Sequence, residues 1–302
     1  MKNKRQREIL LSLLLTSGII LIGLIGLFVF DRYSSNNSVI FRIEEGQEQI
    51  YKDKKWQELI IRGINITPRD GSDDFNNEEL SKNAYKRWFR QLASDGVNIV
   101  QLNTILPPAF YQAFFEYNIL TDKPLYLLHG VMIDERNVNL YLNAYEDKLI
   151  NDLFDEITRT IDIVNGKATF RQPNRKEAVT YKANITPYVI GYILCESENT
   201  AFITATNEKN PNIVGFEGDY LYTWNASPYE AWLAAVGNYM IYYEQEKYGG
   251  PFRHVSWTGL SNQGYGTNTE IDKATGVNFA NIHITEKFDA GIMAFQKFPG
   301  TY

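Results

Sequence analysis

Several residues with ring or amide side chains lie near the expected ends of strands, where they could bind a substrate by stacking or hydrogen bonding. Tyr111, Trp224 and Trp257 lie in or beside such strand-end loops, where an aromatic face could stack on a sugar ring. Most aromatic side chains pack in protein cores, so core packing is the alternative. Asn103 and His129 each lie near the end of a predicted strand and could contact a substrate there. These five positions are the candidate substrate-binding residues.

The sequence contains no pattern typical of a metal ion, a nucleotide or an activated nucleophile. His129, His254 and His283 are the only histidines, and they do not fall at metal-ligand spacing. The single cysteine, Cys195, ends an apolar strand, where a buried thiol behaves as a small hydrophobic residue. No serine lies in a G-x-S-x-G elbow, and no G-x-G-x-x-G loop follows a strand. We therefore predict no metal and no cofactor.

Short apolar strands alternate with amphipathic helices from residue 59 onward. Strands are predicted at 59–66, 97–104, 124–131, 188–195, 252–258 and 290–295. Helices are predicted at 78–94, 109–117, 145–164 and 227–248, and a hairpin within 167–184. The last helix begins with Ser227, Pro228 and Glu230, which is typical of a capping box. This alternation predicts an α/β protein in which a parallel sheet packs against helices.

Two architectures fit this pattern: a doubly wound open sheet and a (β/α)8 TIM-type barrel. The doubly wound nucleotide-binding folds lack their main support here, because no phosphate-binding loop follows a strand. Long polar loops follow several of the predicted strands, and a barrel builds its site from the loops at the carboxyl ends of its strands. The pattern favours the barrel.

The first 30 residues predict a membrane anchor. The segment from Ile9 to Phe30 carries no charge and is long enough for a transmembrane helix, which needs about 20 apolar residues. The residues before it are basic and those after it nearly neutral, which places the N-terminus in the cytoplasm and the C-terminal domain outside. A cleavable signal peptide is the alternative, but the apolar run is long and no small-residue cleavage site follows it.

These features divide the chain into four parts. We predict a cytoplasmic basic segment at 1–8, a transmembrane helix at 9–30, a tether with a first strand at 31–56, and a barrel domain at 57–302. The protein is then expected in the cell membrane as a single-pass protein. Its formal net charge of −6 argues against nucleic acid as a partner, because a phosphate backbone binds basic surfaces.

Several longer strings resemble a known family. They read RGINI, NIVQLNTILPPAFYQAFFEYN, PLYLLHGVMIDE, VIGYIL, TNEKNP, SPYEAWLAAVGNYM and HVSWTGLSN. Over roughly residues 56–300 they resemble a bacterial group of membrane-anchored, glycoside-hydrolase-like (β/α)8-barrel proteins. The resemblance implies the barrel fold, and a cell-envelope or extracellular polysaccharide, or an oligosaccharide from it, as the ligand.

The resemblance also implies a pair of catalytic carboxylates. In such barrels one carboxylate protonates the leaving oxygen and the other attacks the sugar or activates water. The acid is expected at the end of the fourth strand, where this sequence has Ser197 between Glu196 and Glu198. A bulge at the strand end would bring Glu198 into the mouth of the barrel, so Glu198 is favoured over Glu196 as the acid. The alternative is that both are solvated loop carboxylates.

Two departures from the family pattern bear on activity. Gln101 stands where the family carries an arginine that supports the nucleophile. The predicted strands also reach only the sixth before Tyr302, so no strand-seven nucleophile is found. We therefore expect a barrel that is incomplete at its C-terminal end, whose open edge a partner would cover. The departures favour a non-catalytic carbohydrate-binding or envelope-assembly protein over an active glycosidase or transglycosidase, and an inactive fragment of a longer glycosidase is a third possibility.

Overall fold

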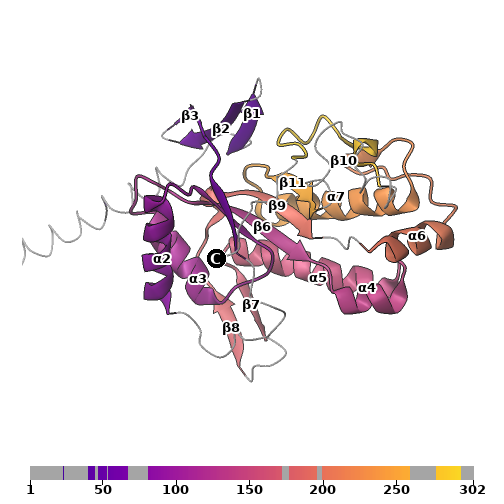
Figure 1. Ribbon diagram of the computed structural model, residues 1–302, viewed down its shortest axis with the longest axis horizontal. Coiled ribbons are helices and arrows are strands. Elements are labelled where there is room, and N and C mark those ends of the chain that lie inside the picture. Colours follow the sequence, from indigo (N-terminus) through magenta and orange to yellow (C-terminus); the bar gives the residue numbers. More distant parts are fainter. Residues whose placement is uncertain are drawn as a thin grey trace, which may run out of the picture.

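A five-stranded parallel sheet forms the centre of the computed structural model, which describes residues 23, 40–44, 47–52, 54–66, 81–171, 177–195, 199–258 and 277–293 (Figure 1). The strands lie in the order β11-β9-β6-β5-β4, so neighbours in the sheet follow one another along the chain. Their bounds are β4 (Gly63–Ile66), β5 (Ile99–Leu102), β6 (Tyr126–Met132), β9 (Val189–Cys195) and β11 (His254–Trp257).

Six helices supply the large core on one face of the sheet, which we call the helix face. They are α2 (Lys82–Ser94), α3 (Pro108–Asn118), α4 (Glu135–Tyr141), α5 (Asp147–Val164), α6 (Thr200–Lys209) and α7 (Pro228–Tyr248). Alternate residues of the strands, such as Val100, Leu127 and Leu194, join this core. Burial of these apolar side chains is the main force that holds the helices against the sheet.

The opposite face of the sheet, which we call the second face, packs on a small antiparallel sheet. That sheet consists of β1 (Phe41–Glu44), β2 (Gln47–Lys52) and β3 (Lys55–Glu58). Phe41 and Ile50 share a core with Ile99 of β5 and Ile190 of β9. The backbone oxygen of Phe41 is also 2.9 Å from Nε2 of His254. The described part of the predicted tether therefore belongs to the folded core.

The described residues form an open sheet of five parallel strands in place of the predicted (β/α)8-type barrel, which was itself expected to be incomplete at its C-terminal end. A barrel closes only when its first and last strands pair, which in this class takes eight strands. Here β4 and β11 end the sheet and are not paired with each other among the described residues. The predicted sixth strand appears there only as a single parallel bridge between Val255 and Ile292. The fold is a mixed α/β structure with a five-stranded parallel sheet.

The membrane prediction is also corrected. Within the described part of the chain, no helix combines the length and the apolar character needed to cross a bilayer. Apart from Gly23, the predicted span from Ile9 to Phe30 lies outside the described residues. The expected single-pass topology and the expected location in the cell membrane therefore find no support in the described residues.

Local sequence signals explain several element boundaries. The side chain of Ser227 accepts a hydrogen bond from the Glu230 backbone, and the Glu230 carboxylate accepts one from the Ser227 backbone at 2.8 Å, which confirms the predicted capping box of α7. Gly166 ends α5 with φ +67°, and a β-carbon there would lie 2.8 Å from the backbone of residues 182–184. The predicted hairpin forms as β7 (Ala168–Arg171) and β8 (Ala178–Tyr181).

Two short elements that the sequence pattern did not predict lie outside the central sheet. They are β10 (Leu221–Thr223) and β12 (Ile282–Ile284), which pair as an antiparallel ribbon beside α7. The 3-10 turns η2 (Thr186–Tyr188) and η3 (Phe279–Asn281) precede β9 and β12 directly. The ribbon places residues 221–224 and 281–284 next to each other in space.

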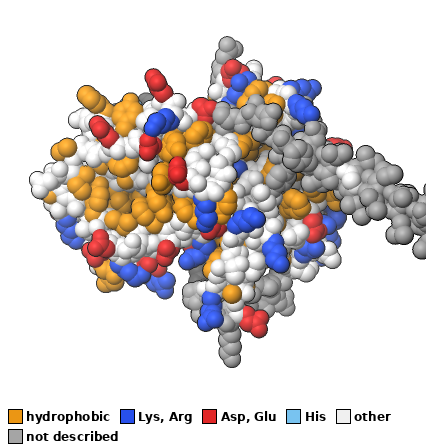
Figure 2. Space-filling model, turned by 180° about the vertical axis from the view of Figure 1, so that it is seen from behind, with side chains coloured by type: hydrophobic (Ala, Val, Ile, Leu, Met, Phe, Trp, Pro, Cys, Tyr) orange, Lys and Arg blue, Asp and Glu red, His pale blue; other side chains and the backbone are white. Residues whose placement is uncertain are grey.

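Aromatic side chains are numerous on the outer surface of the helix layer. Phe154 of α5 and Tyr239 of α7 stack with ring centroids 4.0 Å apart, and Tyr242 is exposed nearby on α7. Figure 2 shows hydrophobic side chains gathered over the half of the molecule that contains α5, α6 and α7. The Phe154–Tyr239 stack therefore packs α5 against α7.

Candidate functional site

The carboxyl ends of the five parallel strands meet at one edge of the sheet, where α/β proteins place their ligands. The segments that follow β4, β9 and β11, residues 67–80, 196–198 and 259–276, lie outside the described residues. The described part of this edge therefore consists of the strand residues themselves and of the segments that follow β5 and β6. On the second face, these residues include a group of amides.

Three amide side chains form this group, which we call the amide cluster: Asn65, Gln101 and Asn103. Asn65 of β4 and Gln101 of β5 pair in register, so their side chains lie on the same face, opposite Ile64 and Val100 of the helix-side core. Nε2 of Gln101 donates to Oδ1 of Asn103 at 3.2 Å. All three are uncharged groups that can both donate and accept hydrogen bonds.

One atom of the amide cluster lacks a hydrogen bond. Asn65 is 7% exposed, and its Oδ1 has no donor among the described residues. Buried polar atoms are nearly always hydrogen-bonded in proteins, so an exception calls for an explanation. Met132, at the end of β6, is 43% exposed, so solvent reaches the end of that strand. Asn65 is the next-to-last residue of β4, so its buried acceptor without a donor lies near the carboxyl edge of the sheet.

Three of the predicted substrate-binding residues belong instead to the core of the helix face. Trp257 is completely buried there, with its ring 5.9 Å from that of Phe279. His129 pairs in register with Leu102 of this face, and Tyr111 of α3 covers it. None of the three side chains presents a surface that a ligand could contact. Of the five predicted substrate-binding residues, only Asn103 is a member of the amide cluster.

His129 and Tyr111 form a hydrogen-bonded pair whose proton positions follow from their partners. Nδ1 of His129 is 2.8 Å from the backbone oxygen of Gly130, which can only accept, so Nδ1 carries the proton. Nε2 then accepts from the Tyr111 hydroxyl at 2.8 Å, and that hydroxyl accepts from the Leu106 backbone at 3.3 Å. Burial lowers the pKa of His129 to about 4 and raises that of Tyr111, so both are neutral near pH 7. The pair is a structural link between α3 and β6.

The remaining predicted residues fall elsewhere. Trp224 is 75% exposed and lies at the end of the β10–β12 ribbon, on the outside of the helix layer. Glu196 and Glu198, the predicted catalytic carboxylates, lie outside the described residues, as does Ser197 between them. Gln101, expected where the family has arginine, is a member of the amide cluster. Asn65 was not predicted, although a single amide inside the apolar run from Ile64 to Ile66 was a signal for it.

The string TNEKNP has a structural role. Thr206 accepts a hydrogen bond through Oγ1 from the Ala144 backbone at 2.9 Å, and Asn207 accepts one from the Tyr229 backbone at 2.9 Å. Lys209 donates to the backbone oxygens of Tyr141 and Leu142, both at 3.1 Å, where α4 ends. The string therefore ties α6 to the α4–α5 connection and to the start of α7.

Replacing Thr206 by valine should destabilise the protein without changing its shape. Thr206 is completely buried, and valine keeps its volume while it removes the acceptor for the Ala144 N–H. An unsatisfied buried donor costs about 1–3 kcal/mol. Chemical denaturation should show that loss in the free energy of unfolding, whereas Thr158→Val, on the exposed side of α5, should change it by less. Equal losses in the two variants would contradict the role of Thr206.

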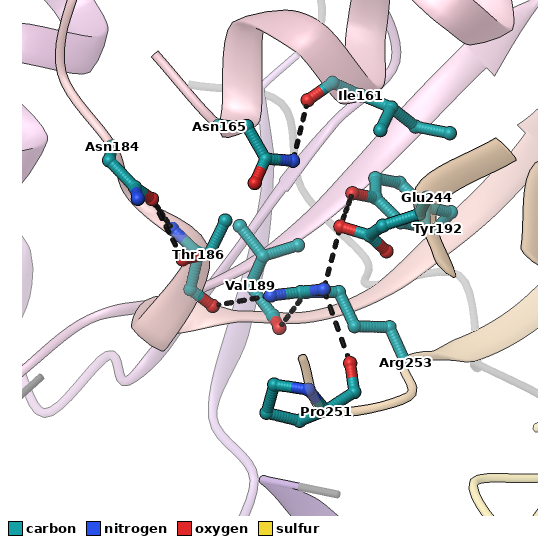
Figure 3. A network of polar contacts seen from close by, with 9 residues as sticks. All are labelled: Ile161, Asn165, Asn184, Thr186, Val189, Tyr192, Glu244, Pro251 and Arg253. Atoms are coloured by element: carbon teal, nitrogen blue, oxygen red, sulfur yellow. Dashed lines mark hydrogen bonds and ion pairs between the residues drawn. The ribbon is translucent and has the colours of Figure 1, made fainter. Parts of the chain in front are cut away.

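A buried ionic network closes the opposite, amino edge of the sheet (Figure 3). Arg253, just before β11, donates to Glu244 of α7 at 2.7 Å, and both side chains are almost completely buried. The same guanidinium donates to the backbone oxygens of Val189 at 3.1 Å and Thr186 at 2.9 Å. Tyr192 donates its hydroxyl to Glu244 at 3.0 Å. Every group has a partner, so we assign this network to stability.

The described residues contain no cluster of three or more histidine, cysteine, aspartate or glutamate side chains that could hold a metal ion. No protein-family model matches the sequence, and neither a curated protein nor a solved structure matches the chain. The resemblance to glycoside-hydrolase-like proteins therefore rests on the sequence strings alone and stays a prediction.

Proposed function

We propose that this protein is glycoside-hydrolase-like and binds an oligosaccharide, or part of a polysaccharide, at the carboxyl edge of its sheet. The observation that supports this most is the buried Oδ1 of Asn65, which has no donor among the described residues. An acceptor left in this state costs about 1–3 kcal/mol. A sugar hydroxyl is a donor that would satisfy it, and water would do so in the absence of sugar.

The neighbouring side chains favour the same class of ligand. Gln101 and Asn103 are neutral amides, and each combines donors with an acceptor, as sugar hydroxyls do. A site for a phosphate or carboxylate would instead present arginine, lysine or backbone N–H groups. The strings that resemble glycoside-hydrolase-like proteins point to a polysaccharide or oligosaccharide as well. The acidic balance of the chain again argues against nucleic acid.

Isothermal titration of the full chain with short gluco-, manno- and chito-oligosaccharides tests the proposal. At least one should bind, and Gln101→Ala should weaken it about three- to tenfold, the effect of one lost hydrogen bond of about 0.5–1.5 kcal/mol. Asn65→Leu should weaken it similarly while it leaves the free energy of unfolding within about 1 kcal/mol of the wild type, because it removes an acceptor that had no donor.

The matched control is Asn98→Ala. Asn98 is an amide at the amino end of β5, on the same strand as Gln101 but at the opposite edge, where it bonds the backbone of Ile60 and Arg62. This variant should lose stability and keep its affinity for the oligosaccharide. The proposal fails if no oligosaccharide binds the wild type, or if Gln101→Ala and Asn98→Ala bind it equally well.

Catalysis is a second candidate function, and it depends on Glu198. This residue comes directly before Asn199, the N-cap of α6, in the segment that follows β9. If the protein is a glycosidase, it releases reducing sugar from the bound oligosaccharide, and Glu198→Gln abolishes the release without loss of binding. Equal release by the variant contradicts the assignment of Glu198. Binding without any release supports the non-catalytic function, which Ser197 and Gln101 favour.

A further inference from the structure

The β10–β12 ribbon carries ring side chains on the face that points away from α7. Tyr222 of β10 pairs in register with His283 of β12, and their rings stack with centroids 5.2 Å apart. The ladder continues by one hydrogen bond, from the Trp224 backbone N–H to the Asn281 oxygen at 2.9 Å. Trp224 comes directly after the last residue of β10, and this hydrogen bond extends the ladder to it, which favours the side of the ribbon on which Tyr222 lies.

The other side of the ribbon is buried at Leu221 and Ile282, although Ile284 at the end of β12 is 44% exposed, and this burial fixes the direction of the rings. Leu221 and Ile282 belong to the helix-side core, and a methyl group of Leu221 lies 2.9 Å from where a β-carbon of Gly237 in α7 would be. Because side chains alternate along a strand, Tyr222, Trp224 and His283 point outward. We call this surface the aromatic face.

A carboxylate completes the aromatic face. Glu217 forms an antiparallel bridge with Tyr222 on the side away from β12, so the two side chains share a face, and Glu217 is exposed. Trp224 is 75% exposed, whereas Trp232 and Trp257 are buried. Single exposed apolar residues are common, but three rings and one hydrogen-bond acceptor on the same outward surface suggest a binding function.

The aromatic face lies on the side of the molecule that contains the carboxyl edge of the sheet. Trp224 comes three residues before Ser227, the N-cap of α7. Since α7 leads back to the start of β11, the N-terminus of α7 lies on the side of the sheet where the parallel strands end. The aromatic face and the amide cluster are therefore on the same side of the molecule, although on different surfaces.

We propose that the aromatic face is a second carbohydrate-binding surface, which holds another part of the same polysaccharide; this inference rests on the proposed function. The flat C–H face of a pyranose packs on an exposed indole or phenol ring, and the ring hydroxyls at its rim need acceptors, which Glu217 supplies. An apolar protein partner would bury the Glu217 carboxylate without a counter-charge, whereas a sugar hydroxyl donates to it. The ligand is a neutral polysaccharide long enough to contact several rings.

Native affinity electrophoresis of the full chain in gels that contain hydroxyethylcellulose, laminarin, soluble starch or galactomannan tests this inference. The wild type should be retarded by at least one polysaccharide, and Trp224→Ala should raise the dissociation constant for it about three- to tenfold. Trp224 is mostly exposed, so thermal unfolding of the variant should match the wild type. Tyr242→Ala removes an exposed ring of α7 outside the aromatic face and should bind as the wild type does.

The outcomes of these measurements separate the two surfaces. Weaker binding by Trp224→Ala but not by Tyr242→Ala supports the aromatic face. Wild-type affinity of Trp224→Ala, or equal losses in Trp224→Ala and Tyr242→Ala, overturns it. If Trp224→Ala keeps its affinity while Gln101→Ala loses it, the aromatic face fails and the proposed function stands. No retardation of the wild type in any gel, with no binding of short oligosaccharides, overturns both.

Discussion

Replacing Arg253 by methionine should destabilise this protein by about 3–5 kcal/mol, because it leaves a buried carboxylate without its counter-charge. Arg253 and Glu244 are both nearly completely buried and only 2.7 Å apart. The substitution also removes the donor for the backbone oxygens of Val189 and Thr186. Equilibrium unfolding in urea would show the loss as a lower midpoint.

A double variant separates the ion pair from the packing around it. Arg253→Met combined with Glu244→Leu removes both charges together, so it should recover a large part of the stability that the single variant loses. Arg136→Ala is the matched control, because that arginine is 91% exposed and its ion pair with Asp134 is worth at most about 1 kcal/mol. A loss below about 1 kcal/mol in Arg253→Met would contradict the assignment of this network to stability.

Acidification should remove about 3 kcal/mol of stability through His129 alone. Burial lowers the pKa of His129 to about 4, whereas the unfolded chain has the ordinary value of 6.5. Between these values the unfolded state binds a proton that the folded state does not, so stability rises with pH in this window. The contribution is complete above pH 6.5 and is lost as the pH falls toward 4, at about 1.4 kcal/mol per pH unit.

Two variants separate the contribution of His129 to the pH dependence of stability from the contributions of other groups that titrate in acid. His129→Gln has no group to protonate, so the free energy of unfolding should fall between pH 6.5 and pH 4 by about 3 kcal/mol less than in the wild type. Tyr111→Phe should be less stable at pH 7 by about 1–3 kcal/mol, because Nε2 of His129 and the Leu106 N–H lose their partner, yet it keeps a buried imidazole and the pH dependence. An unchanged pH dependence in His129→Gln would show that the imidazole does not titrate in this way.

The local elements could largely be predicted from the sequence. Five of the six predicted strands overlap β4, β5, β6, β9 and β11, and the capping box at Ser227 and the stop at Gly166 are present. These signals act over a few residues, so they need no knowledge of distant contacts. The small sheet β1–β3 was harder to predict, because its packing depends on a contact between Phe41 and His254, which are 213 positions apart.

The face on which each strand residue lies could not be predicted in the same way. A strand buried on both sides has no alternation of polar and apolar residues, so its register with its neighbours is invisible in the sequence. Trp257 and His129 were therefore predicted to line a site, whereas pairing with Leu194 and Leu102 places them on the helix face. The same pairing places Asn65 beside Gln101 on the second face.

Closure of the sheet was likewise a question of tertiary structure. Alternating strands and helices occur in open and in closed parallel sheets, and only the pairing of the first and last strands distinguishes them. In the described residues β4 and β11 both end the sheet. The predicted barrel and the predicted membrane helix both came from patterns of single segments, and the described structure supports neither.

The sequence by itself determined the five strands of the central sheet and the helices α2, α3, α5 and α7 in their order, the start of α7 and the end of α5, and the lack of motifs for a nucleotide or a catalytic serine. These follow from residues within one or two turns of each other, whose conformations depend on local sterics and hydrogen bonding. Only the tertiary structure decided that Trp257 is core, that Trp224 is exposed, and that Asn65 and Gln101 share a face. Burial and register are properties of contacts between distant segments, and such contacts exist only once the chain has folded.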